Sequence, residues 1–248
     1  MRYFIRFSYL GKAYHGWQKQ PNAITVQEVL ENGLSTLLRS NTEIVGAGRT
    51  DTGVHAKEMY AHFDYEPIAD KNDLVYRLNA FLPEDISVYG IHKMQENAHA
   101  RFDAVERTYE YWVVQSKNPF YKDLAHFARY PLDIESMNAA ASFLKEHDDF
   151  ECFSKSNTDV KTFICDVRHA KWETKEDRLI FTISADRFLR NMVRAIVGTL
   201  LDVGMGKMKP EEINNVIKSK SRSEAGVSVP AKGLYLTKVL YPQDIFDE

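Results

Sequence analysis

The sequence predicts an α+β protein built from two similar halves that join near residue 105. Three observations lead to this prediction. Strands with one buried face alternate with amphipathic helices, the order of elements roughly repeats after residue 105, and 44% of the 248 residues are hydrophobic. This is enough apolar material for the cores without metal or disulfide support. Because no linker rich in Pro, Gly or Ser separates the halves, we expect tightly packed domains at residues 1–105 and 106–248.

The first half is predicted to run strand, helix, two strands, helix, strand. Residues 3–9 alternate between apolar and polar side chains, the period of a strand with one buried face. From Val26 apolar residues fall three and four apart, and Thr25 with Glu28 forms the capping box typical of a helix start. The remaining elements are strands near Ile44 and at 59–65 and 86–94, and a helix at 73–80 that ends before Pro83.

The second half is predicted to repeat this alternation. Residues 108–115 alternate as a strand, and an uninterrupted apolar stripe from Leu189 to Leu201 indicates a buried helix. The other expected elements are a helix at 134–146, strands at 163–172 and 179–185, a short helix at 211–218 and a last strand at 234–241.

Charge and cysteine content narrow the function classes only partly. The net charge of −3 argues mildly against a nucleic-acid partner, yet residues 187–222 hold eight basic against three acidic side chains. A patch that faces phosphates and a solvated helical surface explain that run equally well. Cys152 and Cys165 lack C-x-x-C spacing and no export signal is recognisable, which favours a reducing cytoplasm. The apolar stretch 192–203 is too short to span a bilayer, so we expect no membrane segment.

The segment 46–56 is the strongest candidate site in the chain. It lies between two predicted strands and places three glycines around Arg49 and Asp51. Glycines allow backbone conformations that other residues avoid, so such a loop can hold a carboxylate at a sharp turn beside a ligand. A purely structural turn capped by Asp51 explains the same residues, and taken alone the segment favours that explanation.

Two other kinds of site have little support. His55, His62 and Asp64 could suggest zinc or iron, but the two histidines do not share a helical face and no cysteine accompanies them, so structural histidines are the simpler interpretation. A serine hydrolase also lacks support, because Ser8, Ser154 and Ser184 have no nucleophile-elbow context. We therefore expect no metal.

Blocks spread over residues 9–241 resemble the TruA family of tRNA pseudouridine synthases. The segment 46–56 is similar to that family's signature loop, in which the Asp after Arg-Thr is the catalytic carboxylate. The sequence departs from the family between residues 155 and 166, where Lys161 stands at a place often taken by Arg, and at Val229. The other similar blocks are Tyr9-x-Gly11-x-x-Tyr14-x-Gly16-Trp17-Gln18-x-Gln20, Asn79-x-x-Leu82-Pro83-x-Asp85-Ile86, His99-Ala100-Arg101-Phe102, Arg107-x-Tyr109-x-Tyr111, Ala185-Asp186-x-Phe188-Leu189-Arg190-Asn191-Met192-Val193-Arg194 and Gly233-Leu234-Tyr235-Leu236.

The resemblance implies an isomerase that needs no cofactor. Asp51 would act at the anomeric carbon of the target uridine, either by attacking it or by removing the neighbouring 2′ proton. A buried ionised Asp needs a cation, and the resemblance supplies Arg194. Tyr109 would stack on the base and help to remove the C5 proton, and Arg49 would fill the space that the flipped base leaves. Phe188 and Arg190 would also contact the substrate.

Structural explanations remain for two of these residues, because Tyr109 could be a core tyrosine and Arg49 a surface ion-pair partner. The resemblance further implies two α/β halves with mostly antiparallel sheets, flanking helices and a central active-site cleft. The expected substrate is tRNA, at uridines 38, 39 and 40 of the anticodon stem-loop, and the expected unit is a cytoplasmic homodimer. The competing classes are a catalytically silent tRNA-binding protein or tRNA chaperone, and a nucleoside hydrolase.

Overall fold

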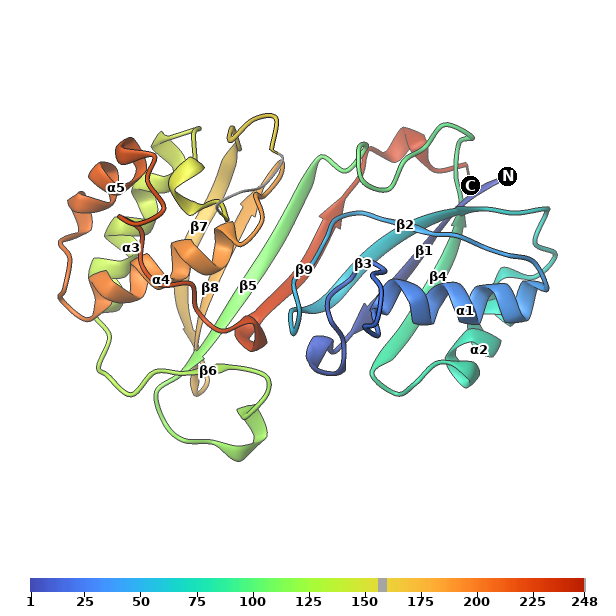
Figure 1. Cartoon of the computed structure of the whole chain (residues 1–248), viewed down its shortest axis with the longest axis horizontal. Helices are drawn as coiled ribbons and strands as arrows, with labels where there is room; N and C mark the ends of the chain where they lie inside the picture. The colour runs from blue at the N-terminus through green and yellow to red at the C-terminus, as the bar shows by residue number, and fades with distance from the viewer. Residues whose placement is uncertain (156–159, 248) are drawn as a thin grey trace. The chain divides into compact units, whose positions relative to one another are not determined.

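The computed structural model describes residues 1–155 and 160–247, which form two compact units (Figure 1). The first unit consists of Met1–Val105 and Tyr235–Glu248, and the second of Glu106–Leu234. Each unit combines β-strands with α-helices, so the predicted α+β class is confirmed. Of the stretch 155–166, in which the sequence departs from the TruA pattern, residues 156–159 lie outside the described residues.

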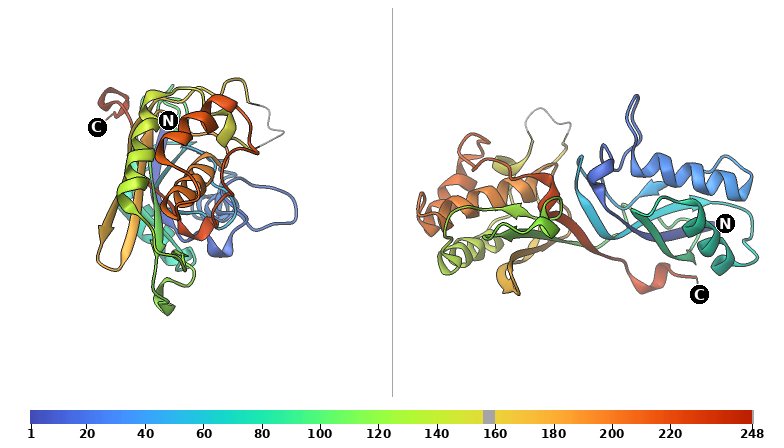
Figure 2. Two further views of the ribbon diagram at one scale, coloured as in Figure 1. Left: turned by 90° about the vertical axis from the view of Figure 1, so that its left-hand side faces the viewer. Right: turned by 90° about the horizontal axis from the view of Figure 1, so that it is seen from below.

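The first unit is built on strands in the order β4-β1-β3-β9, with the short strand β2 also paired to β3. Strand β1 is antiparallel to both of its neighbours, and β9 runs parallel to β3 through His55 opposite Tyr235 and Ala56 opposite Leu236. Helices α1 and α2 lie next to each other in this unit (Figures 1 and 2). The elements are β1 (Arg2–Tyr9), α1 (Val26–Leu38), β2 (Val45–Gly46), β3 (His55–Asp64), α2 (Lys71–Phe81), β4 (Ile86–Lys93) and β9 (Leu234–Leu240).

Local backbone and side-chain features set both ends of helix α1. The Thr25 hydroxyl accepts a hydrogen bond from the Glu28 amide at 3.4 Å, which satisfies one of the first free amides of the helix. At the other end Arg39 takes a left-handed conformation with φ of 55°. The predicted apolar stripe faces the core, because Val26, Leu30 and Leu34 are fully buried.

The second unit carries an antiparallel sheet with the strand order β5-β8-β7. Helices α3 and α4 lie side by side in this unit (Figures 1 and 2), and α3 also contacts β7. Nearly every residue of α4 is buried, as its continuous apolar stripe predicted. The elements are β5 (Glu106–Val114), β6 (His126–Phe127), α3 (Ile134–Phe143), β7 (Val167–Lys175), β8 (Arg178–Ala185), α4 (Met192–Gly204) and α5 (Ile213–Ser219).

Two boundaries in the second unit differ from the prediction. Strand β7 begins at Val167 rather than near residue 163, because the preceding backbone is bonded elsewhere: the Cys165 amide donates to Asp148 O at 2.9 Å, and the Asp166 amide to the Asp186 carboxylate at 2.7 Å. Helix α4 begins at Met192 rather than Leu189, because Asn191 has a positive φ of 69° that interrupts the helix. The short strand β6, parallel to β5, had no predicted counterpart.

The division of the chain also differs from the predicted boundary at its C-terminal end. The prediction places residues 235–248 in the second half, whereas they belong to the first unit. Long-range contacts hold them there: the Val239 amide donates to Glu58 Oε1 at 3.1 Å, and the Tyr241 hydroxyl to Ala100 O at 2.6 Å. None of the helices within the described ranges is long and apolar enough for a bilayer span.

Candidate active site

The segment 46–56 leads from β2 to β3 and contains a tight turn over residues 51–54. The Val54 amide donates to Asp51 O at 3.1 Å, which closes a four-residue turn. Gly53, the third residue, has φ of +79°, the region that a type II turn requires at this position and that favours glycine. Asp51 is half-buried and Arg49 is exposed. The turn therefore presents a carboxylate two residues after an exposed guanidinium.

Three glycines allow close packing around this turn. A Cβ on Gly16, whose φ is +91°, would lie 2.6 Å from Thr50 O, and a Cβ on Gly11 would overlap Val54 O. Gly46 lies against the Trp17 ring so closely that a Cβ would be 2.5 Å from it. Side chains at these positions would therefore push the turn away from the segment 11–17 that supports it.

The histidines beside the turn hold backbone groups. His55 is buried, its Nδ1 accepts a hydrogen bond from the Gly11 amide at 2.9 Å, and its ring stacks on Tyr235 with 4.7 Å between centroids. His62 Nδ1 accepts from the Ala100 amide at 3.1 Å, and burial lowers the pKa of this ring to about 4. Both therefore have structural roles. Within residues 1–155 and 160–247, no three His, Cys, Asp or Glu side chains form a group that could hold a metal ion.

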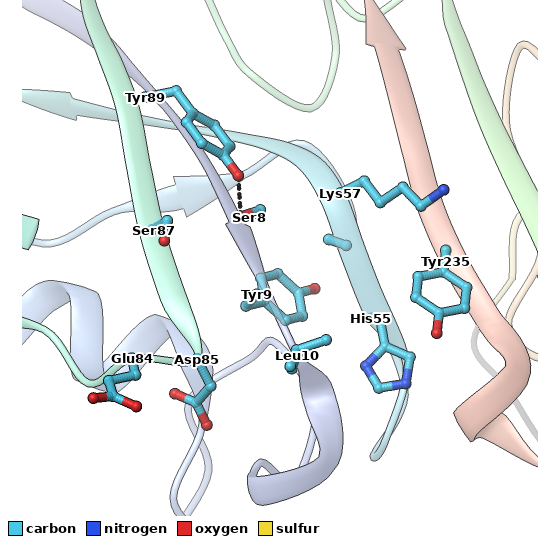
Figure 3. Close-up of a pocket in the computed structure, with 11 residues that line it drawn as sticks. Ser8, Tyr9, Leu10, His55, Lys57, Glu84, Asp85, Ser87, Tyr89 and Tyr235 are labelled. Atoms are coloured by element: carbon cyan, nitrogen blue, oxygen red, sulfur yellow. Dashed lines mark hydrogen bonds between the residues drawn. The ribbon is translucent and has the colours of Figure 1, made fainter. Parts of the chain in front are cut away.

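An open hollow of about 230 Å³ lies on the first unit beside His55 (Figure 3). Its lining combines one lysine with two carboxylates and several hydroxyl groups, and in Figure 3 Lys57 and His55 of β3 lie beside Tyr235 of β9. Asp51 is not among the lining residues. This hollow therefore does not coincide with the predicted carboxylate. Its lining residues are Ser8, Tyr9, Leu10, His55, Ala56, Lys57, Glu84, Asp85, Ser87, Tyr89 and Tyr235.

In the second unit the structure brings Tyr109 and Phe188 together. Tyr109 lies on β5 opposite Ile183 of β8, and its ring meets the edge of Phe188 with 5.1 Å between centroids and 87° between planes. Both rings are half-buried. Edge-to-face packing of this kind restricts the orientation of each ring. Tyr109 is therefore braced by Phe188, and it is only half-buried.

Arg190 lies two residues before α4, and Arg194 lies in the first turn of that helix. Arg194 Nε donates to Val229 O at 2.7 Å, and the Val229 amide donates back to Arg194 O at 3.2 Å, so the guanidinium is oriented along one edge. Gly198 makes this arrangement possible, because a Cβ there would overlap the carbonyl of Val227. Arg190 is exposed. Arg49 and Asp51 belong to the first unit, and Tyr109, Phe188, Arg190 and Arg194 to the second.

Several basic residues of the run 187–222 have partners within the second unit. Lys207 pairs with Asp202 at 3.1 Å, and Lys220 with Asp149 at 2.6 Å. Arg222 donates to backbone carbonyls of its own loop, which is a structural role. Part of the local charge excess is thus used within the unit, and Arg190, a candidate substrate-binding residue of this run, is exposed.

Comparison with known proteins identifies the family. A family model described as tRNA pseudouridine synthase matches residues 6–103 and 139–242. The chain belongs to the tRNA pseudouridine synthase family. Proteins named tRNA pseudouridine synthase A from Bacteroides fragilis, Porphyromonas gingivalis and Bacillus licheniformis are 52%, 48% and 40% identical to it. These alignments cover 99%, 99% and 97% of this chain, and 98%, 99% and 99% of the relatives.

The family match covers most of the candidate site residues. The turn with Arg49 and Asp51 and the start of α4 with Arg194 fall inside the matched segments, whereas Tyr109 falls between them. The resemblance found in the sequence blocks is confirmed. Gly16 and Trp17 belong to one of those blocks, and the structure identifies them as supports of the turn, a role that the sequence did not reveal.

Proposed function

We propose that the protein isomerises uridine to pseudouridine in tRNA, with Asp51 as the catalytic carboxylate. The observation that supports this most strongly is the turn 51–54, a tightly braced backbone that presents a half-buried carboxylate within a matched segment of the family. We further propose uridines 38, 39 and 40 of the anticodon stem-loop as the targets. The working unit is a homodimer in the reducing cytoplasm, a compartment suited to two free buried cysteines.

The proposed reaction conserves all atoms of the substrate. The bond between uracil N1 and the ribose anomeric carbon breaks, the base turns, a bond forms from C5 to that carbon, and the C5 proton leaves while N1 gains one. No oxidant or energy source is required. Asp51 acts on the sugar in one of two ways. As a nucleophile it bonds to the anomeric carbon and is displaced when C5 attacks that carbon, and as a base it removes the 2′ proton and later returns it. An ionised carboxylate in a closed site requires a cation, and Arg194 supplies it.

The aromatic and cationic residues hold the extruded nucleotide. Tyr109, braced by Phe188, offers a ring on which uracil stacks without being tied to one orientation, as a base that must turn requires. The same tyrosine helps to remove the C5 proton. The exposed Arg49 fills the space that the flipped base leaves in the stem, since a guanidinium can stack and bind phosphate together. Arg190 contacts the tRNA backbone.

Tritium release from tRNA labelled at C5 of uracil tests this function, because isomerisation expels that hydrogen. The wild type should release tritium without added cofactor, and Asp51→Asn and Asp51→Ala should release none while their tRNA affinity stays within about threefold of the wild type. Glu43→Gln, a change at an exposed carboxylate just before β2, is the matched control and should remain active. Near-normal turnover by either Asp51 variant would contradict the assignment, and binding without turnover by the wild type would favour a silent tRNA-binding protein.

A further inference from the structure

A buried hydrogen bond holds the residue that directly precedes the candidate carboxylate in the sequence. The hydroxyl groups of Tyr9 and Thr50 are 2.8 Å apart. Tyr9 is 3% exposed and Thr50 8% exposed, so water has little access to either residue. A buried hydroxyl without a partner is unfavourable, which makes this pairing a strong constraint on the position of Thr50.

The same residue is held a second time through its backbone. Thr50 O accepts a hydrogen bond from the Trp17 amide at 3.2 Å and lies against Gly16. The two restraints come from different parts of the chain, since Tyr9 ends β1 and Trp17 follows the loop after it. Stacking links these parts, because Phe7 lies 6.1 Å from Tyr9 and 5.5 Å from Trp17, measured between ring centroids. Thr50 is therefore attached to a packed aromatic layer that consists of Phe7, Tyr9 and Trp17.

Burial alternates along the three residues of the Arg49-Thr50-Asp51 triplet. Arg49 is exposed, Thr50 is buried and Asp51 is half-buried. With the middle side chain held in the core, its two neighbours are left on the accessible side of the turn. The residue between the two candidate functional side chains is thus the one that attaches the triplet to the fold.

We propose that Thr50 and Tyr9 are positioning residues, whose buried hydrogen bond aims Asp51 at the sugar of the target uridine. This inference rests on the proposed function. Neither hydroxyl needs to touch the substrate, because Thr50 acts through the adjoining backbone of Asp51. Displacement of a catalytic group by about 1 Å can lower a rate by about 100-fold, so a small loosening of the turn should affect turnover far more than binding.

The test compares variants that remove the hydrogen bond with variants that keep it. Thr50→Val and Tyr9→Phe each preserve shape and delete one hydroxyl, whereas Thr50→Ser keeps the hydroxyl. Tyr65→Phe is the matched control, because it deletes a tyrosine hydroxyl that donates to Leu38 O at the same 2.8 Å in the same unit. Tritium release from C5-labelled tRNA then gives kcat and KM, and thermal unfolding shows that each variant is folded.

We expect Thr50→Val and Tyr9→Phe to lower kcat about 10- to 100-fold with KM for tRNA within about twofold of the wild type. Thr50→Ser should stay within about threefold of the wild type, and Tyr65→Phe should match it. The double variant Tyr9→Phe/Thr50→Val should lose no more than the worse single variant, because both changes break one bond.

Three results would overturn the inference. The bond is only structural if folded Thr50→Val and Tyr9→Phe turn over tRNA as Tyr65→Phe does. The hydroxyl is not the cause if Thr50→Ser is as impaired as Thr50→Val. If the wild type is active and Thr50→Val and Tyr9→Phe are unaffected, only this inference is refuted. If the wild type releases no tritium, the proposed function is refuted and this inference with it. Should Thr50→Val fail to fold, Tyr9→Phe decides the outcome.

Discussion

Replacement of Gly16 by alanine tests the packing around the turn that carries the candidate carboxylate. Gly16 has φ of +91°, a conformation that costs alanine about 1–3 kcal/mol. The new Cβ would also lie 2.6 Å from Thr50 O, 3.2 Å from Asp51 C and 3.3 Å from Thr52 N. Since Cβ atoms essentially never approach other heavy atoms within 3.0 Å, the turn must retreat by at least about 0.4 Å.

The expected effect is a loss of both stability and turnover. We expect Gly16→Ala to destabilise the protein by about 2–3 kcal/mol, which lowers the melting temperature by about 5–10 °C for a chain of this length. The displaced turn should lower kcat about 10- to 100-fold. Thermal unfolding and tritium release from labelled tRNA measure the two quantities on the same preparation.

Gly206→Ala separates conformational strain from displacement of the turn. Gly206 also has a positive φ, of +71°, but a Cβ there has no atom within 4 Å. This variant should lose about 1–2 kcal/mol of stability for the same backbone reason and keep the wild-type kcat. If Gly16→Ala and Gly206→Ala were equally destabilised and equally active, the close approach of Gly16 to the turn would have no role in catalysis.

Three further predictions concern groups whose surroundings are known. Burial lowers the pKa of His62 to about 4, so the stability that its neutral ring contributes is complete above about pH 6.5 and is lost as the pH falls toward 4. In urea unfolding, the free energy of unfolding of the wild type should fall by about 2 kcal/mol more than that of His62→Gln between pH 7 and pH 5. Parallel pH profiles would contradict this prediction. Burial raises the pKa of Cys152 and Cys165 to about 12, which keeps both thiols protonated at pH 8. An aromatic disulfide reagent at that pH should modify neither thiol in the folded protein and both in denaturant. Rapid labelling of the native protein would refute this prediction. Phe188→Ala removes the ring that packs against Tyr109. An aromatic pair contributes about 0.5–1.5 kcal/mol, so kcat/KM should fall about 2- to 13-fold. An unchanged kcat/KM would show that the contact with Phe188 is not needed for turnover.

Patterns confined to neighbouring residues predicted the secondary structure well. Strand β1 and helix α1 follow from alternation over residues 3–9 and from the Thr25 cap, because both signals depend on side chains only a few positions apart. The predicted start of α4 was wrong by one turn. Leu189 is buried like the helical stripe that follows it, but apolar spacing cannot report that Asn191 adopts a positive φ.

The turn that carries Arg49 and Asp51 was recognisable from its glycines and from the family resemblance. Its supports were not, because they lie about 30 to 40 residues away in the sequence. Nothing in the segment 46–56 shows that Tyr9 would bond to Thr50 or that Gly16 would lie against its carbonyl. Such contacts form only because folding brings β1 and the loop after it next to the segment 46–56, and this depends on the packing of the core.

The composition and local periodicity of this chain were sufficient for its α+β class and for most of its helices and strands, and its glycines together with the family resemblance marked the loop that holds the candidate carboxylate. Only the tertiary structure placed residues 235–248 in the first unit, paired Tyr109 with Phe188 and attached Thr50 to the aromatic layer. The physical reason is that helix and strand signals arise from neighbours along the chain. Strand partners, ring contacts and close glycine approaches are decided by segments that meet only when the chain folds.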